Sequence, residues 1–303
     1  MSAGFEGSGL EDALAQQRAS HGRILPFCTL PWQATSLPDF VEGSIQILER
    51  CRQMGARGLK IPKVLGLVAR DVDGTRLAVD SPRLDPIFEA AGRLGLIVLI
   101  HSGDPRAFFE PATPANERWE ELQSHPRWSF HGPQYPSFDQ VLGEFERRVL
   151  RHPRTTFIGA HFGNCAEDPA RVARLLERAP NYFIDTAARV PEFGRHPAAT
   201  MRAFFMRWHE HVLFGTDAGL SADPTTWVLG SGGDTLTTPA DVDRFFRSTF
   251  RYFESNDRRF ENPTPIQGRW TIDGVGLPPD VLRRIYGGNA ARLFGLPWPP
   301  PPS

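Results

Sequence analysis

The sequence has little of what marks disulfide-rich, membrane or nucleic-acid-binding proteins. Its three cysteines, Cys28, Cys51 and Cys165, are odd in number and widely spaced among 303 residues, which fits neither a disulfide framework nor a zinc ribbon. No apolar run approaches the roughly 18 residues of a membrane span, and no charged-then-apolar leader is visible. The formal net charge is -1, without a basic cluster. We therefore expect a cytoplasmic protein with no membrane or nucleic-acid partner.

Lysine is also scarce. Only two of the 34 basic residues are lysines, and both, Lys60 and Lys63, lie in the segment GLKIPK. Arginine is always charged, whereas the amine of lysine is compact and its pKa can be tuned by its surroundings. The position predicts a role for Lys60 at a functional site, with chance clustering of two rare residues as the alternative.

Three short apolar runs end in residues that can carry chemistry. The first, Ile97–Ile100, is rich in β-branched residues, typical of a buried parallel strand, and His101 follows it. The runs TFIGA and HVLFG lead in the same way to His161 and Asp217. Parallel α/β folds carry their chemistry at the carboxyl ends of strands. Two histidines and an aspartate there form a partial ligand set for a divalent metal.

Strand candidates alternate with helical segments along the chain. There are six of them: Arg23–Leu30, Gly58–Ile61, Ile97–Ile100, Thr156–Ala160, Tyr182–Ile184 and His211–Gly215. This alternation predicts a parallel sheet, either open or closed. A closed (β/α)8 barrel has two strands more, and the N-terminus is the only stretch without a strand candidate.

The domain organisation follows from the same alternation, since no linker interrupts it. We expect a single domain over residues 1–296, with long insertions at 102–140 and 218–277 on the catalytic side. The first insertion is rich in aromatic residues and proline, which is typical of a lid or pocket wall, or of a packed excursion. The tail at 297–303 is proline-rich, and we expect it to be disordered.

Six motifs, in this order and spacing, resemble one known family. They are GLKI at Lys60, VLIHSGDP at His101, FIGAHFGN at His161, YFIDTAAR at Asp185, LFGTDAG at Asp217 and GGNAARLFGL near the end. The chain resembles the amidohydrolase superfamily of metal-dependent enzymes, specifically the "amidohydrolase 2" group related to aminocarboxymuconate semialdehyde decarboxylase. The resemblance implies an α/β fold of the (β/α)8 TIM-barrel type, with six of the eight strands recognisable here.

The resemblance also implies roles for the polar residues at the strand ends. His101 becomes a metal ligand, and Asp217 becomes both a metal ligand and the general base. His161 is either a further ligand or the acid/base that protonates the leaving group, which is its role in one-metal members. The metal is zinc, with manganese as the alternative.

Substrate-binding residues are expected on the same side. Lys60 is either a carboxylated ligand that bridges two metals or a cation that binds substrate, with a buried ion pair to Asp185 as the alternative. Asp185 is itself a candidate for substrate binding. Arg106 and Arg189 are candidates for a clamp on a substrate carboxylate, with surface salt bridges as the alternative.

One part of the family pattern is missing. In the family the first strand supplies a His-x-His or Glu-x-His pair to the metal, and this sequence has no such pair before the later strands. His209 and His211 have the spacing, but they precede the last strand. We expect either a misassigned start or a shortened relative.

The function expected from this pattern is metal-dependent hydrolysis of a C–N or C–O bond in a small molecule that carries a carboxylate. Nonoxidative decarboxylation of a small carboxylic acid, as a carboxy-lyase, is the alternative. A catalytically silent relative is the third interpretation. The oligomeric state stays open in the sequence, a homo-oligomer included.

Overall fold

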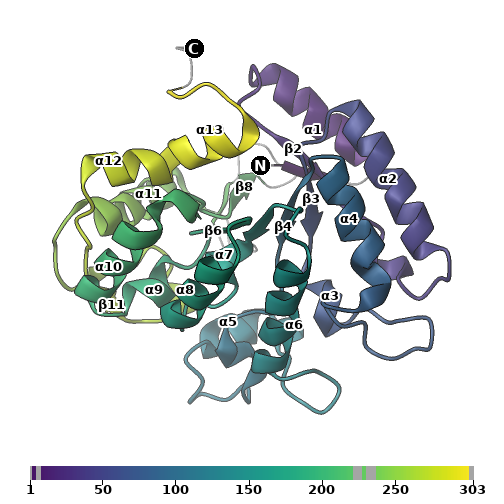
Figure 1. Ribbon diagram of the computed structural model, residues 1–303. Coiled ribbons are helices and arrows are strands. Elements are labelled where there is room, and N and C mark those ends of the chain that lie inside the picture. Colours follow the sequence, from purple (N-terminus) through teal and green to yellow (C-terminus); the bar gives the residue numbers. More distant parts are fainter. Residues whose placement is uncertain (1, 5–7, 221–226, 230–236, 300–303) are drawn as a thin grey trace. The chain divides into compact units, whose positions relative to one another are not determined.

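The computed structural model describes residues 2–4, 8–220, 227–229 and 237–299, and the chain falls into two compact units (Figure 1). The first unit consists of Met1–Asp104, Gly132–Ala160 and Glu177–Phe183, and the second of Pro105–His131, His161–Leu176 and Ile184–Ser303. The predicted site residues are divided between them. Lys60 and His101 belong to the first unit, whereas the second contains Arg106, His161, Asp185, Arg189 and Asp217.

The first unit is built on five parallel strands that pair in chain order. They are β1 (Ser2–Gly4), β2 (Pro26–Cys28), β3 (Gly58–Ile61), β4 (Ile97–Ile100) and β5 (Phe157–Gly159). Leu59 lies opposite Val98, which in turn lies opposite Phe157, and all three side chains are buried. A Cβ at Gly58 would come within 2.4 Å of the Ile97 carbonyl oxygen, so this register requires glycine. The predicted strands of this unit are confirmed.

Strand β1 was not predicted from the sequence. Its residues are Ser, Ala and Gly, with no β-branched or aromatic side chain to indicate a strand. The backbone nevertheless pairs parallel with β2, with Ala3 opposite Phe27. The expectation that the N-terminus holds no strand is therefore wrong.

The helices of the first unit bury apolar residues. They are α1 (Ser8–Ala19), α2 (Phe40–Met54), α3 (Val64–Leu67), α4 (Asp85–Arg93) and α6 (Phe138–Arg151). Helix α2 buries Phe40, Leu48 and Cys51 and ends at Gly55, whose φ of 111° suits glycine. Helices α2 and α4 pack side by side (Figure 1). This packing covers the sheet whose strands β3 and β4 lead to Lys63 and His101.

The other two predicted strands end in the second unit. The last residues of β6 (Tyr182–Asp185) pair parallel with β7 (Val212–Leu213), Ile184 opposite Val212. Two small antiparallel pairs follow, β8 (Ala218–Leu220) with β9 (Trp227–Leu229) and β10 (Phe260–Glu261) with β11 (Thr271–Ile272). These pairs lie in the long insertion at 218–277, where the sequence predicted no strands.

Helices make up most of the rest of the second unit. They are α5 (Trp119–Ser124), α7 (Ala160–Gly163), α8 (Pro169–Arg178), α9 (Val190–Gly194), α10 (Ala198–Trp208), α11 (Pro239–Glu254), α12 (Pro279–Arg283) and α13 (Asn289–Phe294). The core is largely aromatic: the Phe162 ring lies 4.8 Å from the Phe193 ring and 5.0 Å from the Phe204 ring. This cluster anchors the chain directly after His161.

No helix in the described ranges is long and apolar enough to cross a membrane. The predicted disordered tail lies partly outside the described residues, which end at Pro299. The single domain over residues 1–296 stays a prediction.

Candidate functional site

In the first unit, His101 forms part of a small charged cluster directly after strand β4. Its backbone N–H donates to the Ile61 carbonyl oxygen at 3.0 Å. Its Nε2 lies 3.4 Å from Asp104 Oδ1, and Lys63 Nζ donates to Asp104 Oδ2 at 2.5 Å. Asp104 is buried, whereas the Lys63 side chain is 28% exposed. The structure thus adds Asp104 and Lys63 to the predicted His101.

Burial and neighbouring charges together set the protonation states of His101 and Asp104. It lowers the pKa of His101 to about 4, although the hydrogen bond and charge of Asp104 oppose the shift. The positive charges of Lys60 and Lys63 lower that pKa further. Burial would raise the pKa of Asp104, but the His101 hydrogen bond and the Lys63 charge outweigh it and hold the pKa below its usual range. At neutral pH a neutral imidazole therefore lies beside an ion pair.

Replacing Lys63 tests how far this carboxylate depends on its cation. We expect Lys63→Met to lower the free energy of unfolding by about 1–3 kcal/mol, because it leaves a buried charge without its partner. Lys63→Arg keeps the charge and should cost less than half as much. Urea denaturation at pH 7 of the three proteins measures both differences. Equal stability of wild type and Lys63→Met would show that the ion pair contributes nothing.

In the second unit, His161 is held through its main chain by a side-chain carboxylate and through its ring by a backbone carbonyl. Its N–H donates to Asp185 Oδ1 at 2.8 Å, and its Nδ1 lies 3.0 Å from the Ala187 carbonyl oxygen. A carbonyl oxygen only accepts, so Nδ1 carries the proton of this bond. In the neutral ring Nε2 therefore holds the lone pair that can take a proton or bind a metal.

The backbone around this histidine is strained. His161 has φ 55° and ψ 54°, and Phe162 has φ 58° and ψ 46°, both in the left-handed region. Ala188 and Asp217 share that conformation, with φ values of 54° and 58°. Such residues cost about 1–3 kcal/mol each and cluster at functional sites. The ends of β5 and β7 and the turn after β6 thus all contain left-handed non-glycine residues.

Asp217 lies just beyond β7, where the sequence predicted a ligand and general base. It is exposed, and it follows Gly215 and Thr216. The Thr186 hydroxyl donates to the Gly215 carbonyl oxygen at 2.9 Å and accepts from its N–H at 3.0 Å. The turn after β6 is therefore bonded to the segment that leads into Asp217.

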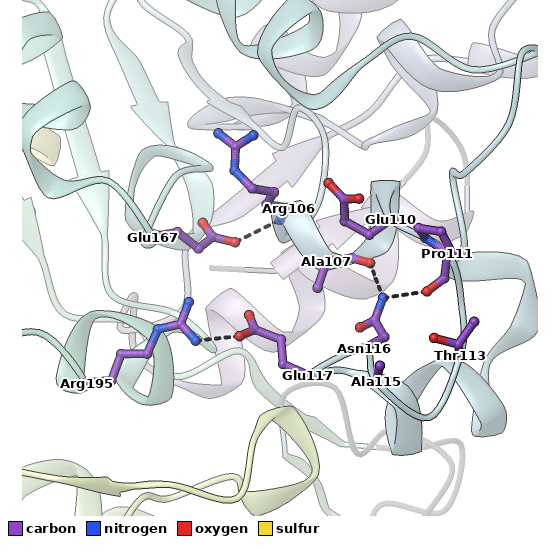
Figure 2. A pocket seen from close by; sticks show the side chains of 10 residues that line it. All are labelled: Arg106, Ala107, Glu110, Pro111, Thr113, Ala115, Asn116, Glu117, Glu167 and Arg195. Carbon is purple, nitrogen blue, oxygen red and sulfur yellow. Dashed lines mark hydrogen bonds and ion pairs between the residues drawn. The ribbon is translucent and has the colours of Figure 1, made fainter.

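The two predicted substrate arginines differ in their surroundings. Arg189 is buried, and its guanidinium donates to the Ala188 carbonyl oxygen at 2.8 Å. Arg106 is exposed and lines a pocket of about 460 Å³ in the second unit. Figure 2 shows the polar contacts of this pocket: the Arg106 backbone N–H donates to Glu167 at 2.8 Å, and Arg195 pairs with Glu117 at 2.7 Å. None of the predicted catalytic residues lines it.

Lys60 lies on strand β3 with its side chain half-buried. Its backbone carbonyl oxygen accepts a hydrogen bond from the Thr29 hydroxyl at 3.0 Å. Its charge contributes to the lowered pKa of His101. A role of Lys60 as a metal ligand or a substrate-binding cation stays a prediction.

A buried charged cluster in the second unit was missed by the sequence analysis. The side chains of Arg118, Glu121 and Glu192 are almost completely excluded from solvent, and the guanidinium contacts both carboxylates. Arg118 also lies 5.7 Å from the Phe108 ring centre. The sequence did not indicate this cluster, because arginine and glutamate side chains are usually exposed at the protein surface.

The sequence matches the model of one protein family, described as Amidohydrolase, over residues 27–296. The chain belongs to the amidohydrolase family. The family resemblance carried by the six motifs is thereby confirmed. No curated protein matches the sequence.

Solved structures of similar fold support the fold class. A 2,6-dihydroxybenzoate decarboxylase from Rhizobium is 18% identical, with a TM-score of 0.51, covering 94% of this chain and 75% of that one. A dihydroxybenzoic acid decarboxylase from Polaromonas sp. JS666 with bound manganese and the inhibitor 2-nitroresorcinol is 16% identical, with a TM-score of 0.52 and coverages of 94% and 73%. An uncharacterized TIM-barrel protein from Bordetella bronchiseptica is 16% identical, with a TM-score of 0.52 and coverages of 94% and 71%. The fold of this amidohydrolase is accordingly of the TIM-barrel type.

The family implies a metal ion, so we asked whether side chains that can bind a metal lie together in this structure. Within residues 2–4, 8–220, 227–229 and 237–299, no three side chains of His, Cys, Asp or Glu are gathered so as to hold one. His101 has a carboxylate as its neighbour, and His161 is bonded to a backbone carbonyl through Nδ1. The described residues therefore do not form a three-ligand metal site as they stand. We therefore derive no chemical step through a metal.

Proposed function

We propose that this amidohydrolase hydrolyses a C–N or C–O bond in a small molecule that carries a carboxylate. The observation that carries the proposal is the fixed orientation of His161. Its Nδ1–H bond to the Ala187 carbonyl oxygen fixes the ring at the carboxyl end of β5 and places the lone pair of the neutral ring on Nε2. That end of a parallel strand is where TIM-barrel enzymes carry their chemistry.

His161 suits proton transfer because its ring keeps one hydrogen bond in both protonation states. Nε2 takes up a proton from solvent and donates it to the leaving group, while Nδ1–H remains bonded to Ala187, and the proton that Asp217 takes from the attacking water returns to solvent. Asp217, exposed beyond β7, is the proposed general base that takes a proton from the attacking water. Such acid/base groups typically contribute about 10²–10⁴-fold to rate.

The substrate carboxylate is proposed to meet an arginine. A guanidinium binds a carboxylate through two parallel hydrogen bonds. Arg106, which lines the pocket in Figure 2, is the exposed candidate, whereas Arg189 is buried and already donates to Ala188. Lys60 is the other residue proposed here for substrate binding.

A divalent metal is the cofactor to test. The Polaromonas decarboxylase of similar fold has bound manganese, and the family resemblance favoured zinc. His101, His161 and Asp217 are the donors whose replacement tests this proposal. We expect His101→Ala and Asp217→Ala to release co-purified metal, and His161→Ala to retain it, as measured by elemental analysis.

Decarboxylation is the second candidate. Two solved structures of similar fold are named as decarboxylases of dihydroxybenzoates, and these substrates also carry a carboxylate. Hydrolysis yields a new acid, alcohol or amine, whereas decarboxylation releases carbon dioxide. The two candidates are therefore separated by their products.

The experiment offers the purified protein, with zinc or manganese added, a panel of lactones, amides and aryl carboxylates. We expect new acid from a lactone or amide, and a loss of at least about a hundredfold in kcat for His161→Gln. His209→Gln is the matched control, because His209 makes the same kind of Nδ1 bond, to the Met206 carbonyl oxygen at 3.0 Å. Carbon dioxide release would replace hydrolysis by decarboxylation, and no turnover with any compound would favour the silent relative.

A further inference from the structure

We infer that Asp185 is a positioning residue, whose carboxylate holds His161 in its active conformation through the backbone and does not bind substrate. The inference deepens the proposed function and rests on it for the effect on turnover. Its structural content, the conformation of His161, can be measured without any reaction.

The Asp185 carboxylate is engaged by the protein backbone. Asp185 Oδ1 accepts from the His161 N–H at 2.8 Å and from the Ala187 N–H at 3.0 Å. The residue is only 5% exposed. A substrate-binding carboxylate must present its oxygens to the substrate, whereas this oxygen is engaged by two main-chain donors.

The backbone at His161 is held in a strained conformation. His161 and the following Phe162 are both left-handed, and neither is a glycine. Such a conformation persists only where the surrounding structure holds it. The Phe162 ring packs against the rings of Phe193 and Phe204, and the Asp185 carboxylate accepts the His161 N–H. Without the carboxylate, one of these two restraints is lost.

The turn after Asp185 connects the carboxylate to the ring. Ala187 donates its N–H to Asp185 Oδ1 and accepts the His161 Nδ1–H with its carbonyl oxygen. One aspartate therefore orients both the backbone of His161 and, through Ala187, the tautomer of its ring. A Cβ at Gly215 would lie 3.2 Å from the Ala187 Cβ, so the turn also packs closely against the segment before Asp217.

The test compares two replacements of Asp185. Asp185→Asn keeps a side-chain oxygen that accepts from both N–H groups, whereas Asp185→Ala removes it. Nitrogen-15 NMR of the histidine rings, with the His161 signal assigned by His161→Gln, reports the tautomer. We expect the Nδ1–H form in wild type and Asp185→Asn, and a mixture of tautomers in Asp185→Ala.

The kcat and KM of the same variants give a second test. Misplacing a catalytic group by about 1 Å costs on the order of a hundredfold in rate. We expect a loss of that size in kcat for Asp185→Ala with little change in KM, and a loss of less than about tenfold for Asp185→Asn. If Asp185→Ala fails to fold, Asp185→Ser, whose hydroxyl is too short to reach both amides, takes its place.

Three results would overturn the inference: an unchanged tautomer in Asp185→Ala, equal losses in Asp185→Asn and Asp185→Ala, or a rise in KM as the main effect of both. Equal losses or a raised KM would mean that the charge itself acts on the substrate. If no substrate is found at all, the proposed function fails. The NMR comparison then still decides whether Asp185 positions His161.

Discussion

Replacing Arg118 by methionine is expected to lower the free energy of unfolding by about 3–5 kcal/mol. The guanidinium lies between Glu121 and Glu192, and all three side chains are buried. Burial lowers the pKa of Arg118, and the charge of Glu121 is the main opposing influence. Removing the only cation that contacts both carboxylates in the described structure leaves two like charges buried without a partner. Breaking a buried pair in this way costs far more than the intact pair contributes.

The position of Arg118 gives its loss a local consequence. It directly precedes α5 in the aromatic insertion, and Glu192 lies in α9 after strand β6. The cluster therefore joins the insertion to the helix that follows the Asp185 turn. We expect limited proteolysis of Arg118→Met to begin in the insertion, before the rest of the second unit is cut.

Urea denaturation followed by circular dichroism at pH 7 measures the loss of stability. Arg127→Met is the matched control, because Arg127 is an exposed arginine in the same insertion. It should change stability by no more than about 0.5 kcal/mol. Adding Glu192→Gln to Arg118→Met removes one of the two stranded charges and should recover part of the loss. A stability of Arg118→Met within about 1 kcal/mol of wild type would contradict the prediction.

The strands could be predicted because their signal is local. Runs such as IVLI and YFID are apolar and short, and the turn residues around them mark their ends. Strand β1 and the antiparallel pair of β8 and β9 gave no such signal. Ser2–Gly4 has no strand-forming residue, and Trp227 in β9 is exposed. Their pairing depends on neighbours in space, which a single sequence does not reveal.

The site was predictable in its residues but less so in their roles. His161 and Asp185 stood out because each follows or ends a buried run. The bond between the Asp185 carboxylate and the His161 backbone joins residues 24 positions apart and depends on a left-handed backbone that no residue type announces. In the same way, Lys63 was noted only beside Lys60. Its pairing with Asp104 spans 41 positions and depends on how two loops meet.

Acidification is expected to destabilise the protein between about pH 6.5 and pH 4 through His101. Burial lowers the pKa of this ring from 6.5 to about 4, with Asp104 opposing and two lysines assisting. Between these two pH values the unfolded chain binds a proton at His101 that the folded chain does not. Stability therefore falls as the pH falls, and the loss reaches about 3 kcal/mol near pH 4.

Other groups add to this slope with the same sign. Burial lowers the pKa of His152, so its protonation also favours the unfolded chain. The pKa of Asp104 is held below its usual value of 3.8 by His101 and Lys63, which outweigh burial, and its contribution is lost only at more acidic pH. The region between pH 6.5 and pH 4 thus reports mainly on buried histidines.

Urea denaturation of the metal-free protein at pH 7, 5.5 and 4 measures the slope in wild type, His101→Gln and His152→Gln. His101→Gln cannot take up the proton, so its stability should fall less steeply with acid than that of wild type. His152→Gln should flatten the curve by a smaller amount, because the Arg148 carbonyl, which accepts from His152 Nδ1, and the Asp85 charge both favour the protonated ring and oppose the lowering of its pKa. If His101→Gln kept the full wild-type slope, the ring of His101 would titrate normally, and its burial beside Asp104 would have to be revised.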